Sequence, residues 1–102
     1  KMVDGGIPFH MISDQAGNIG RAYGVYDETQ GIELRGRFII DPDGVVKSFE
    51  LNDLSLGRSG RETLRKVRAA RYVRENEGEV CPAGWEPGAD SLSPSLDLVG
   101  KI

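Results

Sequence analysis

The chain has 102 residues, of which 38% are hydrophobic and 28% are charged, and its formal net charge is −3. A chain of this length forms one domain or part of one, and its hydrophobic content excludes a wholly disordered protein. No apolar run approaches the roughly 18 residues of a membrane span, and the N-terminus lacks the pattern of a secretory signal, so we expect a cytoplasmic protein without membrane contact.

The charges are unevenly spread along the sequence. Residues 58–74 contain seven basic residues and one acidic residue, and the segments on both sides are acidic. A basic run can attract nucleic acid electrostatically. Such a run is more often the solvated face of a helix, so we expect no nucleic-acid binding.

The first part of the chain predicts two short elements. The apolar run at residues 8–12 (PFHMI) predicts a strand, and residues 16–23 predict a weak helix interrupted by glycines. His10 falls in the predicted strand, and we expect it to be packed there. The chain has one His and one Cys, which do not make a metal-ligand set, so no metal is expected.

A β-hairpin is predicted next. Residues 32–40 and 45–51 are rich in β-branched and aromatic residues, and the turn sequence DPDG joins them. Four residues also match positions of a calcium-binding loop: Asp41, Asp43, Gly44 and Glu50. The first ligand would be Ile39, which has no side-chain oxygen, so we reject calcium in favour of a hairpin turn.

A long helix is expected from Ser59 to about Asn76. Ser59 is followed three residues later by Glu62, a spacing that allows a reciprocal capping box. An apolar stripe at helical spacing indicates that one face of this helix packs on another part of the protein. The stripe consists of Leu64, Val67, Ala70 and Val73.

From Gly78 onward, prolines, glycines and serines predict an irregular tail, whose apolar end at residues 96–102 suggests docking. This tail holds Cys81, the only cysteine, and Trp85, the only tryptophan. One cysteine cannot form a disulfide within its own chain.

Two interpretations of Cys81 remain open from the residues alone. A free cysteine is often a small buried hydrophobe, whereas a thiol in a mobile, exposed segment can exchange disulfide partners. The neighbouring Glu77 and Glu79 would raise the thiol pKa, so Cys81 is poorly suited to be a primary nucleophile.

Several long motifs follow one another in a recognisable order: ISDQAGNIGRAYGV, LRGRFIIDPDGVV, NDLSLGRS, GEVCPAGWEPG and SLDLVGKI. Over essentially the whole chain, the sequence resembles the typical two-cysteine peroxiredoxins, specifically the bacterial alkyl hydroperoxide reductase peroxidase subunit. The resemblance implies an α/β protein with a thioredoxin-like (peroxiredoxin) fold. Only the second half of that fold and its C-terminal arm are expected here, with residues 1–58 in the domain and 59–102 forming the helix and arm.

The resemblance also implies roles for individual residues. Cys81 in EVCP matches the family's resolving cysteine, and Arg35 in LRGRF matches the arginine that stabilises the peroxidatic thiolate and orients peroxide. Arg58 in LGRS resembles a second active-site arginine, and Trp85 resembles the aromatic residue that packs the resolving segment. The peroxidatic Thr-Cys motif has no counterpart in this sequence. We therefore expect the C-terminal portion of a longer peroxiredoxin, inactive towards peroxide by itself.

Partners follow from the same resemblance. A second copy of the protein would form the intersubunit disulfide, the dimers would assemble into a ring, commonly a decamer, and a flavoprotein disulfide reductase or thioredoxin-type donor would reduce the disulfide. No cofactor is implied, and the GKI ending resembles bacterial members, which tend to resist overoxidation. The alternative is a noncatalytic interaction or chaperone-like module that uses the C-terminal arm.

Overall fold

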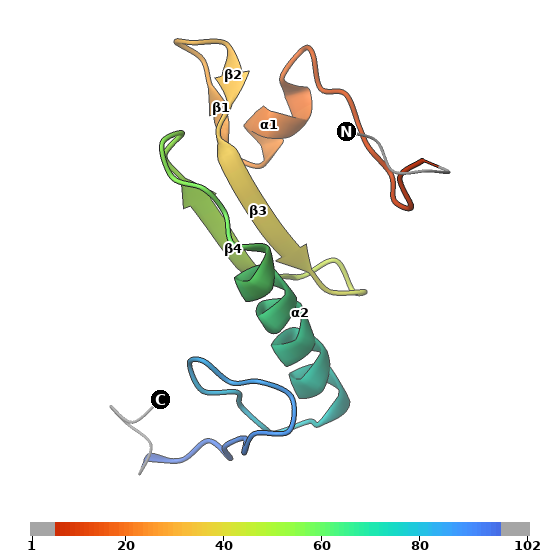
Figure 1. Ribbon diagram of the computed structural model, residues 1–102, viewed down its shortest axis with the longest axis vertical. Coiled ribbons are helices and arrows are strands. Elements are labelled where there is room, and N and C mark those ends of the chain that lie inside the picture. The colour runs from red at the N-terminus through yellow and green to blue at the C-terminus, as the bar shows by residue number, and fades with distance from the viewer. Residues whose placement is uncertain (1–5, 97–102) are drawn as a thin grey trace. The chain divides into compact units, whose positions relative to one another are not determined.

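The computed structural model describes residues 6–96. Contacts within the chain divide it into two compact units, residues 1–34 and residues 35–102, which are described separately. Figure 1 shows the order of the elements along the chain. The predicted boundary between residues 58 and 59 concerns the parent domain and stays a prediction.

The first unit contains a short helix and a small hairpin. Helix α1 spans Asn18–Ala22, within the predicted range of 16–23. The carboxylate of Asp14 accepts hydrogen bonds from the amides of Ile19 (3.1 Å) and Gly20 (2.8 Å). These bonds satisfy amides at the start of α1 that have no partner within the helix.

The hairpin of the first unit was not predicted. Strand β1 (Tyr26–Asp27) pairs antiparallel with β2 (Ile32–Glu33). The Asp27 carboxylate holds the turn between them, since it accepts hydrogen bonds from the amides of Thr29 (2.9 Å) and Gln30 (3.2 Å). Asp27 therefore fixes a turn that joins strands too short to show a periodic pattern.

Gly17 allows the hairpin to lie against α1. Its φ of 77° is in the left-handed region that favours glycine, and a Cβ atom there would lie 2.6 Å from the ring of Tyr26. The close approach and the backbone conformation both require glycine at this position.

The predicted strand at residues 8–12 is wrong. These residues have no regular secondary structure, and the side chains of Phe9, Met11 and Ile12 are 67%, 73% and 78% exposed. His10 is also exposed, so the expectation that it is packed is wrong as well. A strand needs a neighbouring strand to satisfy its backbone groups, and this apolar run pairs with none among the described residues.

The second unit begins with the predicted hairpin. Strand β3 (Arg35–Ile40) pairs antiparallel with β4 (Val46–Asn52). Residues 32 and 33, predicted as the start of the first strand, instead form β2 in the other unit. The Asp41 carboxylate accepts hydrogen bonds from the amides of Asp43 and Val45, both at 2.9 Å, so the interpretation of DPDG as a hairpin turn is confirmed.

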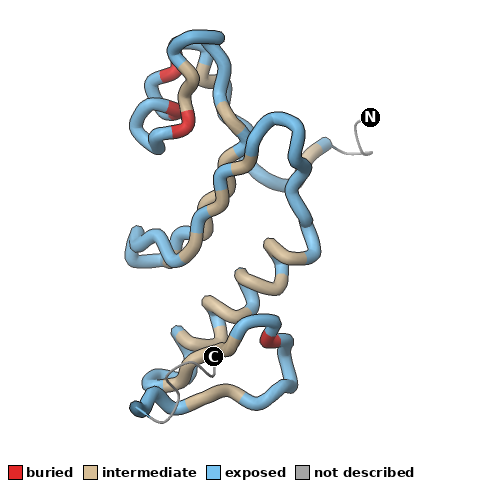
Figure 2. Tube along the Cα trace, turned by 90° about the vertical axis from the view of Figure 1, so that its left-hand side faces the viewer, coloured by how far each residue is buried: buried red, intermediate tan, exposed pale blue. Residues whose placement is uncertain are grey.

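Helix α2 spans Gly60–Glu75, close to the predicted range. The Ser59 hydroxyl caps it by accepting a hydrogen bond from the Glu62 amide at 3.1 Å. Within the predicted apolar stripe, Leu64 and Val67 are exposed, whereas Ala70 and Val73 are half-buried. The stripe is therefore only partly covered by the described residues, and Figure 2 shows the exposure along this helix.

Polar contacts join α2 to the hairpin. Arg37 on β3 donates to the Ser59 carbonyl at 2.7 Å and to the Thr63 hydroxyl. At the other end of the helix, Arg74 donates to the Asp43 carboxylate at 3.0 Å. No helix in the described part of the chain is long and apolar enough to cross a bilayer.

The segment after α2 is irregular, as predicted, and part of it folds back onto the helix (Figure 1). Val80 and Leu92 form an antiparallel bridge with hydrogen bonds of 2.7 and 2.8 Å. The bridge closes residues 80–92 into a loop, the Cys81 loop. Leu96 is 90% exposed, and the rest of the apolar end expected to dock lies outside the described residues.

Candidate functional site

Cys81 lies at the base of its loop, beside α2. Its side chain is half-buried, and Sγ approaches the carbonyl oxygen of Ala69 at 3.9 Å, as a weak thiol donor. The preceding residue, Val80, makes the bridge that closes the loop. The thiol is thus held near the helix by a structured segment.

Trp85 anchors the Cys81 loop. It is 3% exposed, and its ring centroid lies 4.9 Å from that of Tyr72 on α2. Its indole Nε1 donates to the Ala89 carbonyl at 3.1 Å, which satisfies the polar group of a buried ring. The expectation that Trp85 packs this segment agrees with these contacts, and so does the plainer interpretation of Trp85 as a core anchor.

Glu79 makes further hydrogen bonds next to the bridge between Val80 and Leu92. Its carboxylate accepts hydrogen bonds from the hydroxyls of Ser91 (2.6 Å) and Ser93 (2.9 Å). These bonds lower the pKa of Glu79 below its ordinary value because they stabilise the ionised form, that from Ser91 being the larger cause. The Tyr72 hydroxyl also lies within hydrogen-bond distance of Ser91, at 3.1 Å.

The pKa of the Cys81 thiol is raised, as the sequence predicted, but for a different reason. Burial beside α2 disfavours the thiolate and is the main cause, while the positive charge of Arg65 acts in the opposite direction. The prediction assigned the increase to Glu77 and Glu79. Glu79 instead binds two serine hydroxyls.

Arg65 is the residue that the sequence analysis missed. Its Nε and Nη2 donate to the two carboxylate oxygens of Glu62 at 2.7 and 2.8 Å, and its Nη1 donates to the Trp85 carbonyl at 3.0 Å. The spacing of three residues between Glu62 and Arg65 is a signal for the ion pair. Nothing in the local sequence indicates a bond to a carbonyl twenty residues further along the chain.

The two predicted active-site arginines lie near the start of β3. Arg35 is its first residue and is exposed. Arg58, just before α2, donates to the Gly36 carbonyl at 3.3 Å. Within residues 6–96, no group accepts a hydrogen bond from the Arg35 guanidinium.

The predicted site residues therefore form two groups. Cys81 and Trp85 lie along α2, and Arg58 contacts the backbone next to Arg35. Within the described part of the second unit, no hydrogen bond or ion pair joins the two groups.

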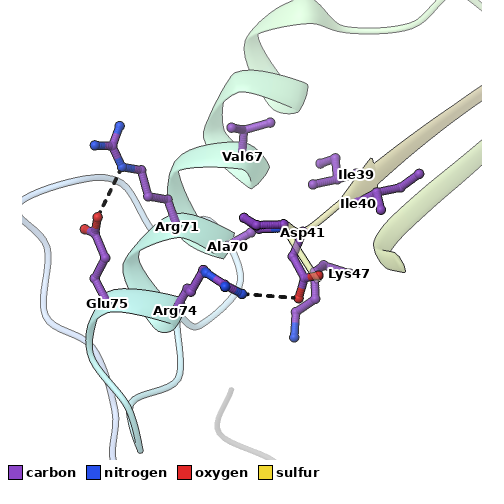
Figure 3. Close-up of a pocket in the computed structure, with 10 residues that line it drawn as sticks. Ile39, Ile40, Asp41, Lys47, Val67, Ala70, Arg71, Arg74 and Glu75 are labelled. Atoms are coloured by element: carbon purple, nitrogen blue, oxygen red, sulfur yellow. Dashed lines mark hydrogen bonds and ion pairs between the residues drawn. The ribbon is translucent and has the colours of Figure 1, made fainter. Parts of the chain in front are cut away.

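A groove of about 370 Å³ opens between β3 and α2, away from these residues (Figure 3). Its apolar lining includes Ile39, Ile40, Pro42, Val67 and Ala70. Charged residues complete the lining: Asp41, Lys47, Arg71, Arg74 and Glu75. No predicted site residue contributes to it. Across residues 6–96, no cluster of three or more His, Cys, Asp or Glu residues could hold a metal ion.

Comparison with known proteins finds peroxiredoxin relatives. The AhpC/TSA family matches residues 2–49, and the C-terminal domain of 1-Cys peroxiredoxin matches residues 69–101. Selenocysteine-containing peroxiredoxin PrxU of Peptoclostridium acidaminophilum is 53% identical over 103 residues, covering 100% of this chain and 51% of that protein. Alkyl hydroperoxide reductase C of Bacillus subtilis (strain 168) is 53% identical over 96 residues, covering 94% of this chain and 51% of that protein.

The chain is a homologue of the two-cysteine peroxiredoxins of the AhpC type. This peroxiredoxin homologue spans about half the length of the curated relatives it matches, 51% of each of these two. The crystal structure of reduced 2-Cys peroxiredoxin from Plasmodium vivax superposes with a TM-score of 0.76 at 36% identity, covering 84% of this chain and 44% of that chain. The predictions of the family and of a partial thioredoxin-like fold are confirmed.

Proposed function

We propose that these residues form the resolving-cysteine part of a thiol-dependent peroxidase that reduces hydrogen peroxide and organic hydroperoxides. A peroxidatic cysteine outside the 102 residues attacks the hydroperoxide, whose O–O bond breaks. The products are a cysteine sulfenic acid and an alcohol or, from hydrogen peroxide, water. The Cys81 sulfur then attacks the sulfenic sulfur, an S–S bond replaces the S–O bond, and water leaves with the thiol proton.

The observation that carries this proposal is the state of Cys81 in a homologue of alkyl hydroperoxide reductase C. The thiol is half-buried on a closed loop, and burial raises its pKa. A thiol that is mostly protonated near neutral pH is a poor first attacker of peroxide. It suits a second step, in which a reactive sulfenic acid is already present.

Arg35 and Arg58 support the same proposal from the other group of residues. Arg35 carries an exposed guanidinium without a partner among residues 6–96, and Arg58 lies against the next backbone carbonyl along β3. A fixed cation with several donors stabilises a thiolate and can orient peroxide oxygens. We assign the direct role to Arg35 and a supporting role to Arg58, beside a peroxidatic cysteine.

The proposed partners follow from the chemistry of the disulfide. As the resemblance to the two-cysteine peroxiredoxins implies, the bond would join Cys81 to the peroxidatic cysteine of a second copy of the protein, and such dimers would assemble into a ring in the cytoplasm. Two thiols of a flavoprotein disulfide reductase or thioredoxin-type donor would return both cysteines to thiols while the donor becomes a disulfide. No cofactor within this chain takes part in these steps.

Replacing Cys81 in the natural full-length protein tests the proposal. Cys81→Ser should abolish the peroxide-induced covalent dimer on a non-reducing gel, while the first turnover of peroxide stays intact. Ser95→Ala is the matched control, since Ser95 is exposed and lies outside the Cys81 loop. A dimer that still forms in Cys81→Ser would contradict the assignment of Cys81 as the resolving cysteine.

A further inference from the structure

We propose that Arg65 is a positioning residue that holds the Cys81 loop on α2 and thereby controls the availability of the thiol. The contact between Arg65 and the loop is part of the reduced structure, so its effect can be measured without peroxide. Its meaning for disulfide formation rests on the proposed role of Cys81.

Arg65 is built into the contact between helix and loop. Two of its nitrogens bind both carboxylate oxygens of Glu62, which fixes the guanidinium plane, and a third donates to the Trp85 carbonyl at 3.0 Å. The Arg65 side chain is 16% exposed, compared with 78% for Arg71 on the same helix. A two-point ion pair with little exposure holds its geometry better than an exposed single contact.

The loop offers Arg65 a fixed partner. The Trp85 ring is buried against Tyr72, and the Trp85 amide donates to the Pro82 carbonyl at 3.0 Å. The turn from Pro82 to Trp85 directly follows Cys81 in the sequence. The Arg65 bond to Trp85 therefore restrains the backbone that carries the thiol.

Several charged or titratable groups surround this contact. Glu62, Arg65 and Tyr72 face it from α2, Glu79 directly precedes the loop in the sequence, and Glu86 lies within the loop. Glu62 is paired with Arg65, and Glu79 with two serine hydroxyls. Arg65 is the group among them whose charge favours the Cys81 thiolate.

A consequence follows for any reaction of Cys81 with a sulfur on another element. A disulfide requires the two sulfurs to come within about 2.05 Å of each other. Cys81 is half-buried beside the Ala69 carbonyl on α2, so release of the loop from the helix makes the thiol more accessible to a sulfur on another element. When the Cys81 loop leaves α2, the hydrogen bond between Arg65 and the Trp85 carbonyl breaks. The strength of this hydrogen bond therefore affects the fraction of time for which the thiol is accessible.

Alkylation of Cys81 measures both effects of Arg65 in the natural full-length protein. The reduced protein is treated with iodoacetamide across a range of pH and then digested with trypsin. The peptide 75–101, which follows Arg74 and ends at Lys101, contains Cys81 and no other cysteine. Mass spectrometry of this peptide gives the rate at Cys81 alone, whatever other thiols are present.

Three variants separate the two effects. Arg65→Met removes the contact and the charge, and Arg65→Lys keeps the charge but loses the two-point pair. Arg71→Met is the control, because Arg71 is paired with Glu75 and exposed. All three variants leave the peptide 75–101 unchanged.

Arg65→Met should raise the limiting alkylation rate at high pH by about tenfold or more, because a hydrogen bond from a charged donor no longer holds the loop closed. Its pH profile should move to higher pH, since the thiolate loses a nearby cation. Arg65→Lys should raise the limiting rate with a smaller change in the profile, and Arg71→Met should change neither.

An unchanged limiting rate and profile in both Arg65 variants would overturn the proposal. If Arg65→Met loses helicity by circular dichroism, Arg65→Lys alone decides the outcome. A negative result for Arg65 is distinct from a negative result for the proposed resolving role of Cys81. The alkylation rate does not depend on a disulfide, and persistent dimers in Cys81→Ser would reject the resolving role but leave the role of Arg65 in place.

Discussion

Two segments of this protein reverse what their composition predicts. Residues 8–12 form the apolar run that most resembles a strand, yet Phe9, Met11 and Ile12 are exposed. The Cys81 loop, which contains two prolines and two glycines, has the pattern of an irregular tail, yet it contains Trp85, which is 3% exposed. Hydrophobicity alone did not decide which segment is buried.

The difference lies in the partners available within each unit. The Cys81 loop lies against α2, which offers the ring of Tyr72 and the guanidinium of Arg65. Residues 8–12 have no strand to pair with among the described residues. A strand is stabilised by pairing and by a covered face, so an apolar run without either stays irregular.

The largest effect is expected from Trp85→Ala. Removing a buried tryptophan costs about 3 kcal/mol, and here the loss falls on the contact between the Cys81 loop and α2. Hydrogen exchange of the Val80 and Leu92 amides, which form the bridge at the base of the loop, should accelerate strongly. Leu96→Ala is the control because Leu96 is 90% exposed. Equal exchange in the two variants would mean that the loop is not anchored by Trp85.

Gly17→Ala tests whether the close approach of the hairpin to α1 holds the first unit together. We expect a loss of about 2 kcal/mol, from a left-handed φ and a clash with the Tyr26 ring. Gly24→Ala separates the two causes, since Gly24 has a φ of 72° but open space around its Cβ position. Its cost should be about 1 kcal/mol. The hydrogen-exchange rate of the Val25 amide measures the loss of stability in both variants. Equal losses in Gly17→Ala and Gly24→Ala would rule out a contribution from the clash.

Ser59→Ala should destabilise the start of α2 by about 1 kcal/mol, because the Glu62 amide loses the hydroxyl that accepts its hydrogen bond. Exchange of the Glu62 amide reports this loss directly. Ser95→Ala, at an exposed position outside any helix, should have no effect on that amide. An unchanged exchange rate of the Glu62 amide in Ser59→Ala would show that water replaces the Ser59 hydroxyl without a loss of stability.

The smallest effect is expected from Ile12→Ser. The Ile12 side chain is 78% exposed, and substitutions at such positions usually change stability by less than about 0.5 kcal/mol. The exchange of the Val25 amide in this chain should therefore stay as it is. A clear acceleration would show that residues 8–12 are packed, and would remove the contrast with the Cys81 loop.

The sequence predicted those parts of the fold that depend on local signals. Helix α2 was recognisable from Ser59 and the spacing of its apolar residues, and the turn between β3 and β4 from DPDG. The hairpin of β1 and β2 was missed because each strand has two residues, although Asp27 marked its turn. The error at residues 8–12 arose because pairing depends on residues far away in the sequence.

The residues of the candidate site also differ in how well the sequence predicts them. Cys81 and Trp85 stood out because each is unique in the chain, whereas Arg35 and Arg58 were recognised only through the resemblance to the peroxiredoxins. Arg65 was not recognised because its role depends on the Trp85 carbonyl, which comes close only after the loop folds back. Side chains that bind a distant backbone atom leave little trace in the sequence.

The central claim is that Cys81 is the cysteine that forms the disulfide. The most direct test is to treat the reduced natural full-length protein with one equivalent of hydrogen peroxide, digest it without reductant, and identify the cross-linked peptides by mass spectrometry. We expect the peptide 75–101 to be joined through Cys81 to a second cysteine-containing peptide, and dithiothreitol to separate them. Recovery of this peptide with a free Cys81 thiol, while peroxide has been consumed, would contradict it.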